Sequence, residues 1–448
     1  MLSTTDAQER ASALIARARR AGPDACDAVY VSDASESVTV RLGQLEDVER
    51  SENEHIGLRV FIGQRSATIG SSDLSDAALD ELADRAVSMA RAAPEDPYAG
   101  LAPQDRLLTG ALPDLDLVDP AALSPRDLRA LALEMEEALR AHPGVTNSEG
   151  ASASAGEAVV ALATSHGFSG AYAGTTRSLS AGALAGEGAT MQRDHAWRSA
   201  RHSSDLLSPA EIGRQAGERA VERLNPARVK SGPLPIIFDP RVAGSLIGPL
   251  LGAMSGSSVA RRSSFLLDRL GQRLFDSAIT IHDDPHWRRG LRARPFDGEG
   301  LPTAPRDLIA DGVLTGWLVD SATGRQLGLP PTGHAARGVS GAPGVGASNL
   351  FMNAGTVSPA ALMEDITEGI YITDMIGHGV NPVTGDYSRG AAGRRIVNGE
   401  LGEPVAGFTI AGNLIDMYAA LTPADDLEDW RVINVPTLRV DGMVVAGD

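Results

Sequence analysis

The stretch Asn381–Met417 reads NPVTGDYSRGAAGRRIVNGELGEPVAGFTIAGNLIDM. Turn formers and short β-forming runs alternate so closely along it that it predicts a compact unit of turns and strands. Asn398-Gly399 lies between Arg394–Val397 and a second β-forming run, which is the strongest short-range signal for a tight β-hairpin. We therefore expect the C-terminal part of the chain to be organised around this hairpin.

Length and composition favour a fold of more than one domain. A chain of 448 residues exceeds the size of one typical hydrophobic core, so two or three domains are expected. Apolar residues make up 43% and aromatic residues only 4%, and the 49 glycines and 26 prolines favour turns and short strands over long helices. The predicted fold class is α+β.

Residues 1–225 predict an N-terminal α+β domain, which divides into possible subdomains 1–93 and 124–225 around a Pro-rich and Asp-rich connection. Helices with serine caps or apolar stripes are expected at 4–20, from Ser75, from Ser124 and at 208–224. Strands are expected at 28–31, 37–42, 56–62 and 66–69, and long antiparallel strands between 145 and 197.

Residues 226–448 predict a β-rich C-terminal domain built on a mixed or antiparallel sheet. The boundary is placed at Asn225-Pro226. A strand at 234–238, an interrupted helix at 241–254 and a helix at 358–370 are expected within this domain.

The net charge and the lack of long apolar segments limit the binding partners and the cell compartment that we expect. A formal net charge of −18, spread along the chain, disfavours binding to nucleic acid or to an anionic membrane surface. The chain has no apolar window of about 18 residues and no apolar N-terminal segment typical of a secretory signal, so we expect a cytoplasmic protein. The single cysteine, Cys26, precedes an apolar run and predicts a buried thiol.

Common catalytic motifs are incomplete in this sequence. Gly167–Ser169 and Gly338–Ser340 both lack the final glycine of a serine-nucleophile turn. Gly344-Val345-Gly346 does not continue into a dinucleotide-binding motif, and Lys230, the only lysine, has no glycine-rich loop before it. Serine hydrolase, dinucleotide enzyme and nucleoside triphosphatase are therefore disfavoured.

Four histidines could bind a metal or another ligand. His282 and His286 flank two aspartates, a composition that suits zinc or iron, but the alternation of strand residues works against convergence of these side chains. His334 and His378 lie in glycine-rich loops, where each could contact a ligand or be solvated.

Three segments together resemble the PmbA (TldE) branch of the TldD/PmbA family: Asn381–Met417, Ser263–Leu266 and Val435–Gly442. The resemblance covers nearly the whole chain. It implies a role in proteolysis, since the TldD branch carries a zinc site. Family members have also been labelled modulators of DNA gyrase, and the negative charge argues against such an effect through contact with DNA.

The zinc motif of the TldD branch, H-E-x-x-x-H, is absent. In that branch two histidines bind zinc and the glutamate acts as general base. The resemblance aligns that motif with Ser245–Ala253, where Gly248, Pro249 and Ala253 take the His, Glu and His positions. None of these side chains can coordinate a metal or transfer a proton, so no catalytic residue, metal ligand or cofactor is expected in this chain.

The resemblance implies a metal-free subunit of a heterodimeric metallopeptidase, in which a TldD-like partner supplies zinc and the pair acts on peptides or unfolded segments. The alternatives are a peptide-binding or chaperone-like module, alone or as a homodimer, and an enzyme with its own metal at His282–His286 or His378. Residues whose chemistry suits an extended peptide backbone are expected to bind substrate. These are His378, Asp386, Tyr387, Ser388, Arg389 and Asn413.

Overall fold

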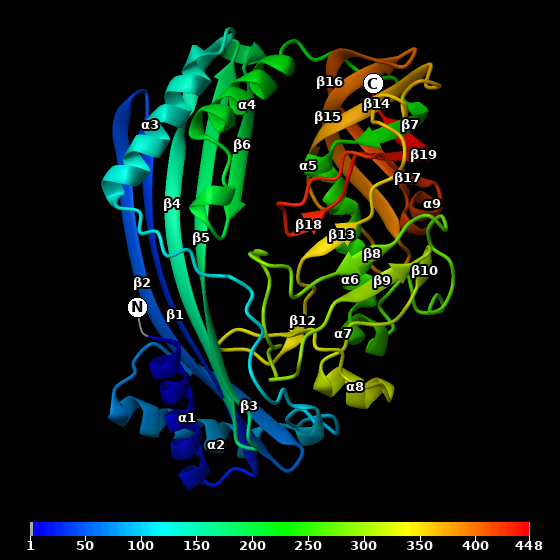
Figure 1. The fold of residues 1–448 in the computed structure, drawn as a ribbon. Helices are drawn as coiled ribbons and strands as arrows, with labels where there is room; N and C mark the ends of the chain where they lie inside the picture. The colour runs from blue at the N-terminus through cyan, green and yellow to red at the C-terminus, as the bar shows by residue number, and fades with distance from the viewer. Residues whose placement is uncertain (1–2, 448) are drawn as a thin grey trace.

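The computed structural model describes residues 3–447 and has an N-terminal and a C-terminal part lying side by side (Figure 1). The N-terminal part contains one antiparallel sheet of order β3-β2-β1-β4-β5-β6. Its strands are β1 (Ala25–Arg41), β2 (Gln44–Ile62), β3 (Arg65–Ser71), β4 (Val145–Thr164), β5 (Ser169–Ala185) and β6 (Gln192–Ala200). The predicted α+β class is confirmed.

The predicted break between residues 31 and 37 is wrong, because β1 runs through it without interruption. Ser32 in the middle of β1 pairs with Glu54 on β2 and with Val159 on β4. Strands on both sides therefore satisfy the backbone hydrogen bonds, and polar side chains do not end the strand. The exposed first half of β2 was missed because its acidic and polar residues give no apolar alternation.

Four helices cover one face of this sheet: α1 (Thr4–Ala21), α2 (Asp76–Ala92), α3 (Pro125–Ala141) and α4 (Pro209–Glu222). α1 and α2 pack on Tyr30 and Leu58, whereas α3 and α4 pack on Val38 and Ala153. Tyr30 and Val38 lie an even number of residues apart on β1, so both helix pairs cover the same face. Short 3₁₀ turns occur at η1 (Gln104–Arg106), η2 (Gly188–Thr190) and η3 (Ser203–Asp205).

The serine caps predicted from sequence are present. Ser124 and Ser208 cap α3 and α4, and Pro125 and Pro209 take their first positions. Cys26 is buried, as predicted, and burial raises the pKa of its thiol to about 11. Among the helices of residues 3–447, none has the length and apolar character needed to span a membrane.

The C-terminal part is built on a sheet of order β16-β15-β14-β7-β19-β17, in which β16 also pairs with β19 and closes the sheet on itself. Its strands are β7 (Gly232–Phe238), β14 (Glu368–Ile376), β15 (Asp386–Val397), β16 (Glu400–Asn413), β17 (Leu421–Pro423) and β19 (Leu438–Ala446). The predicted hairpin is confirmed: Val397 pairs with Glu400, and Asn398 and Gly399 have φ values of 49° and 84°.

A smaller sheet of order β10-β9-β8-β13-β18 lies below the closed sheet (Figure 1). It contains β8 (Ile281–Asp283), β9 (Arg306–Ala310), β10 (Val313–Leu314), β13 (Leu350–Met352) and β18 (Ile433–Asn434), and β11 (Ala335–Ala336) pairs with β12 (Gly344–Val345). The remaining helical segments are α5 (Pro240–Ala243), η4 (Gly244–Leu246), α6 (Ile247–Met254), α7 (Gly256–Ala260), α8 (Ser321–Leu327) and α9 (Leu414–Ala419).

The helix predicted at 358–370 is wrong. Hydrogen-bonded turns occupy the first half of this segment and β14 begins at Glu368. Leu362, Met363 and Ile366 pack with Ile237 and Ile396 in a small core. The apolar residues whose spacing suggested a helix therefore lie in turns, where they pack in this core just before β14 begins.

A buried group of charges joins the two parts. Asp27 on β1 accepts a hydrogen bond from Arg59 Nε on β2 at 3.0 Å and pairs with Arg337 of the C-terminal part. Glu299, also of the C-terminal part, lies 3.8 Å from Arg59. Burial alone would raise the pKa of Asp27, but Arg59 and Arg337 outweigh it and lower that pKa.

The two backbones also approach closely at Gly57 on β2. A Cβ atom at this position would lie 1.7 Å from the carbonyl oxygen of Val339. Only glycine allows this contact, so a side chain here must move the C-terminal segment away.

We predict that Gly57→Ala lowers the free energy of unfolding by about 1–3 kcal/mol, because an added methyl group meets backbone in a filled space. Gly156→Ala is the matched control, since a Cβ on that strand glycine would make only ordinary contacts of 3.7 Å or more. Urea unfolding of both variants measures the difference. Equal midpoints for the two variants would contradict the close approach.

Candidate functional site

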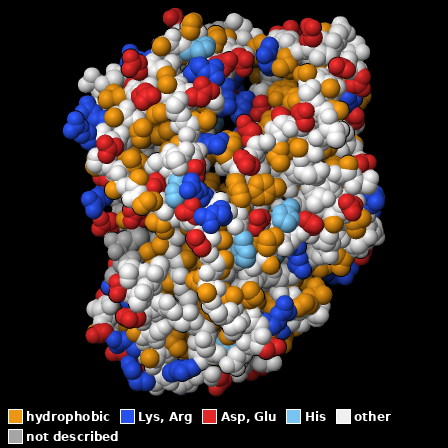
Figure 2. Space-filling view, viewed as in Figure 1, with side chains coloured by type: hydrophobic (Ala, Val, Ile, Leu, Met, Phe, Trp, Pro, Cys, Tyr) orange, Lys and Arg blue, Asp and Glu red, His pale blue; other side chains and the backbone are white. Residues whose placement is uncertain are grey.

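A cleft of about 860 Å³ lies between the two parts. One wall comes from β6 and α4, and the other from α5, η4, β14, β15 and residues 428–431. Figure 2 shows a hollow on this face with basic and acidic side chains around it. The cleft therefore exists only when both parts are docked.

Arginine dominates the lining. The cleft contains one histidine, four carboxylates and seven arginines, although the whole chain has a net charge of −18. The arginines are Arg193, Arg198, Arg219, Arg223, Arg241, Arg389 and Arg431.

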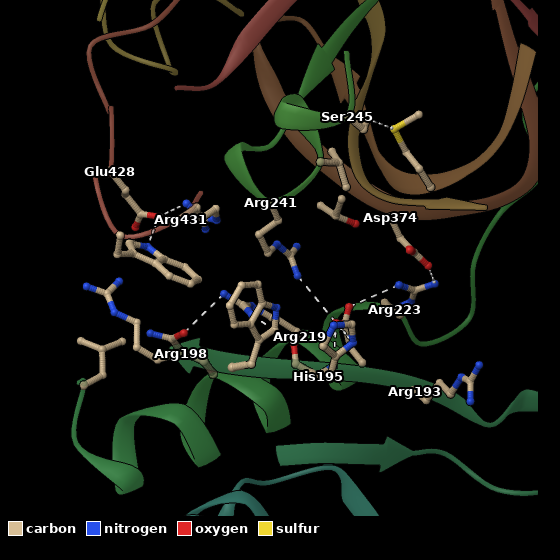
Figure 3. A pocket seen from close by; sticks show the side chains of 18 of the residues that line it. Arg193, His195, Arg198, Arg219, Arg223, Arg241, Ser245, Asp374, Glu428 and Arg431 are labelled. Carbon is tan, nitrogen blue, oxygen red and sulfur yellow. Dashed lines mark hydrogen bonds and ion pairs between the residues drawn. The ribbon is translucent and has the colours of Figure 1, made fainter. Parts of the chain in front are cut away.

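The positions of β6 and of the end of α4 explain why the arginines of these two elements reach the cleft. β6 is the last strand of its sheet, so its side chains border the cleft along an unpaired edge. Arg219 and Arg223 are four residues apart at the end of α4, which brings them to the same side of the helix. Figure 3 shows Arg219 and Arg223 on one side of the cleft and Arg241 on the other, with all three pointing into it.

Ion pairs cross the cleft at Asp194. Arg223 lies 3.3 Å from Asp194 on β6 and 2.9 Å from Asp374 on β14. Arg241 of α5 lies 3.7 Å from Asp194 and 3.1 Å from Asp239. Burial alone would lower the pKa of Arg241, but the two aspartates outweigh it and raise that pKa. Asp194 therefore receives cations from both parts.

Trp430 forms a second link between the parts. Its ring lies 4.4 Å from the guanidinium of Arg198 on β6 and 4.0 Å from that of Arg431. Trp197 packs edge-on against it, with ring centres 4.9 Å apart. Cation–π contacts of this kind fix the indole while leaving the guanidinium edges free for hydrogen bonds.

Three arginines of the cleft have no carboxylate partner among residues 3–447: Arg198, Arg219 and Arg389. Arg219 donates only to the His195 carbonyl at 3.1 Å and to Gln215 at 3.4 Å. The Nε atoms of Arg198 and Arg389 are buried and have no hydrogen-bond partner in the described part of the chain. Burial, followed by the charge of Arg241, lowers the pKa of Arg219, and burial lowers that of Arg198.

The structure brings some of the predicted substrate-binding residues together and separates others. Arg389 lines the cleft. Tyr387 points to the same side of β15 but is 2% exposed, with a hydroxyl 3.8 Å from Met375 Sδ, and burial raises the pKa of Tyr387 to about 12. Asp386 and Asn413 share a 3.2 Å hydrogen bond at the end of the β15–β16 hairpin. Ser388 and His378 are exposed, and neither lines the cleft.

The three other histidines singled out from the sequence, His282, His286 and His334, each make a side-chain hydrogen bond within the fold. His282 Nδ1 lies 2.7 Å from Asp307 Oδ1, and His286 Nε2 lies 3.0 Å from Thr303 Oγ1. His334 is buried rather than solvated, and its Nε2 lies 3.1 Å from Asp283. Residues 3–447 contain no group of three or more His, Cys, Asp or Glu side chains arranged to hold a metal ion.

The segment that resembles the zinc-binding window forms η4 and α6. Ser245 at its start lines the cleft and donates to Met375 Sδ at 3.4 Å. Gly248 is exposed and Pro249 is partly buried on α6, whereas Ala253 is 3% exposed in the core. This segment thus borders the cleft without contributing an acid, a base or a metal ligand at these three positions.

Sequence reasoning missed most of the arginine cluster. Arg193 and Arg198 lie on one short strand, and Arg219 and Arg223 have helical spacing, but Arg241, Arg389 and Arg431 come from distant segments. The one available signal was the density of arginine at 193–201 in an acidic chain. Only the docking of the two parts shows that these groups share a cleft.

Comparison with known domains covers most of the chain. Residues 26–90 match PmbA/TldA metallopeptidase domain 1, residues 118–224 match the central domain, and residues 231–447 match the C-terminal domain. The chain belongs to the PmbA/TldD family. The resemblance inferred from sequence is confirmed.

Relatives support this membership across nearly the full length. The chain is 38% identical to Metalloprotease PmbA of Escherichia coli O157:H7 over 413 residues, which cover 92% of this chain and 90% of that protein. It is 36% identical to the Metalloprotease PmbA homolog of Haemophilus influenzae over 415 residues, which cover 92% of this chain and 90% of that protein.

Solved structures of the PmbA/TldD fold superpose closely. A Bacteroides thetaiotaomicron protein described as a modulator of DNA gyrase gives a TM-score of 0.90 at 28% identity, covering 98% of this chain and 99% of that chain. TldE from Thermococcus kodakarensis gives a TM-score of 0.85 at 20% identity, covering 98% of this chain and 100% of that chain, which shows a shared fold.

We predict that Arg223→Met lowers the free energy of unfolding by about 1–3 kcal/mol, because Asp194 is 8% exposed and loses its closest cation. The matched control is Arg214→Met on the same helix, whose partners Glu211 and Glu218 are solvent-accessible. Its expected effect is below about 0.5 kcal/mol. Urea unfolding of the two variants measures both values. Equal losses of unfolding free energy would contradict a stabilising role for the pair of Arg223 and Asp194.

Proposed function

We propose that this chain is the metal-free subunit of a heterodimeric metallopeptidase that cleaves peptides or unfolded segments in the cytoplasm. A TldD-like partner supplies the zinc ion and the general base. The proposal rests on one feature of the resemblance, which aligns Gly248, Pro249 and Ala253 with the His, Glu and His of the zinc-bearing branch. A chain with these residues cannot activate water at that helix, since the motif needs two imidazole ligands and a carboxylate.

Two findings support a continued role in proteolysis. The chain keeps all three domains of the metallopeptidase family and is similar over its length to proteins named Metalloprotease PmbA. It also shares the fold of TldE from Thermococcus kodakarensis. A protein that retains the family scaffold without the zinc ligands suits the role of a subunit whose partner performs the chemistry.

In this proposal the cleft contributes to the substrate chamber. Its volume of about 860 Å³ accommodates a peptide segment of a few residues and excludes a folded domain. Ser245 and Arg389 border it from the C-terminal part, and β6 borders it with the unpaired edge of a sheet. Substrate held here would be positioned by this chain and cut by the partner.

We predict that the isolated chain binds zinc at far below one ion per molecule after dialysis, because no group of three ligating side chains is arranged around a common point within residues 3–447. Elemental analysis measures the zinc content. His282→Ala and His378→Ala should leave it unchanged. A near-stoichiometric zinc content that either substitution abolishes would instead favour an enzyme with its own metal site.

We predict that mixing this chain with a TldD-like protein gives one heteromeric peak by light scattering and a peptidase activity that exceeds the activity of either protein alone. A mixed pair is expected because only that pair contains a zinc site, and similar subunits can associate through similar surfaces. Substituting the H-E-x-x-x-H motif of the partner should remove all activity.

Two results would reject this proposed function. The two proteins could elute separately at micromolar concentration, or activity could survive loss of the partner's motif. Either result would favour the alternative in which this chain works as a peptide-binding or chaperone-like module, alone or as a homodimer.

A further inference from the structure

The cleft has more positive charge than its own carboxylates can neutralise. Asp194 and Asp374 are already paired with Arg223, Glu428 lies 2.7 Å from Arg431, and Glu149 lies 3.6 Å from Arg193. No carboxylate remains within the lining for the three unpaired arginines.

The unpaired arginines are also incompletely hydrogen-bonded. Arg198 and Arg389 each keep a buried Nε–H with no partner in the described part of the chain. A buried donor without an acceptor destabilises a folded protein unless a ligand or water accepts from it. Arg198 on β6 and Arg389 on β15 belong to different parts of the molecule, and both side chains line the same cleft.

We propose that this cleft binds acidic peptide segments, and that Arg198, Arg219 and Arg389 receive the carboxylates of the peptide. This inference rests on the proposed function and names the substrate class of the same site. Guanidinium groups bind carboxylates through paired N–H donors, and all three side chains are partly exposed. Trp197, which is 42% exposed beside Trp430, offers an apolar surface to neighbouring peptide side chains.

A nucleic acid fits this cleft less well than an acidic peptide does. A phosphate backbone carries a charge at every nucleotide and would continue beyond the cleft over a molecule with a net charge of −18. The cleft also contains four carboxylates, which repel a continuous polyanion. A peptide with a few acidic side chains can place its charges at the unpaired arginines alone.

The test uses fluorescence anisotropy of labelled peptides bound to the full chain. The probes are a short peptide with several glutamates and an amidated C-terminus, and its copy with glutamine at those positions. We expect the glutamate peptide to bind at least about tenfold more tightly, and its binding to weaken as sodium chloride is raised. A third probe, the glutamine peptide with a free C-terminus, tests whether a terminal carboxylate can replace the side-chain carboxylates.

Arg219→Gln and Arg389→Gln should each weaken binding of the glutamate peptide by about tenfold, because each removes one charge-assisted contact. The matched control is Arg214→Gln, which lies five residues before Arg219 on α4 but does not line the cleft. It should leave the affinity unchanged. Circular dichroism and unfolding midpoints show whether each variant is folded. If one of the two cleft variants is unstable, the other still tests the inference.

The inference would be overturned by equal affinity for the glutamate and glutamine peptides, by an equal loss in the Arg214→Gln control, or by no binding of any peptide by the folded chain. Displacement of the glutamate peptide by a lower concentration of a single-stranded oligonucleotide would also overturn it. Tight binding of the free-acid glutamine peptide would support carboxylate binding and assign it to a peptide terminus.

The two proposals fail separately. If the mixed pair cleaves neutral and acidic peptides equally well and the affinities are equal, the inference is rejected and the paired peptidase stands. If the glutamate peptide binds as expected but no mixture has activity, the proposed function is rejected and the cleft remains a binding site for acidic peptides.

Discussion

The buried charges of Asp27, Arg59, Arg337 and Glu299 hold the two parts of this molecule in one arrangement. Asp27 is 1% exposed and lies between two guanidinium groups, one from each part. Removing a partner from such a buried group costs about 3–5 kcal/mol, because the remaining charge is left without water or a counter-ion. Separation of the parts would expose or isolate these charges, so the docked arrangement is strongly specified.

The arginine-lined cleft depends on this docking. Its walls come from β6 and α4 in one part and from α5, β14 and β15 in the other. Asp194 is contacted by Arg223 and Arg241 from either side, and Trp430 rests against Arg198. These contacts, like the buried charges around Asp27, join the two parts. Three arginines that line the cleft take no part in the ion pairs.

The three domains of this family are all present in the chain. Helix α6 carries Gly248, Pro249 and Ala253, and none of these side chains can coordinate a metal or transfer a proton. The cleft contains seven arginines and four carboxylates in a chain with a net charge of −18.

The sequence by itself determined the local elements of this protein. Ser124 and Pro125 fixed a helix start, Asn398-Gly399 fixed a hairpin because its two residues adopt positive φ readily, and the missing H-E-x-x-x-H followed from residue identity alone. The tertiary structure decided what depends on distant partners. β1 continues through polar residues because strands flank it on both sides, and 358–366 forms turns because Leu362 and Ile366 are needed in a small core. The cleft was hidden for the same reason, since Arg389 comes near Arg198 and Arg219 only when the two parts meet.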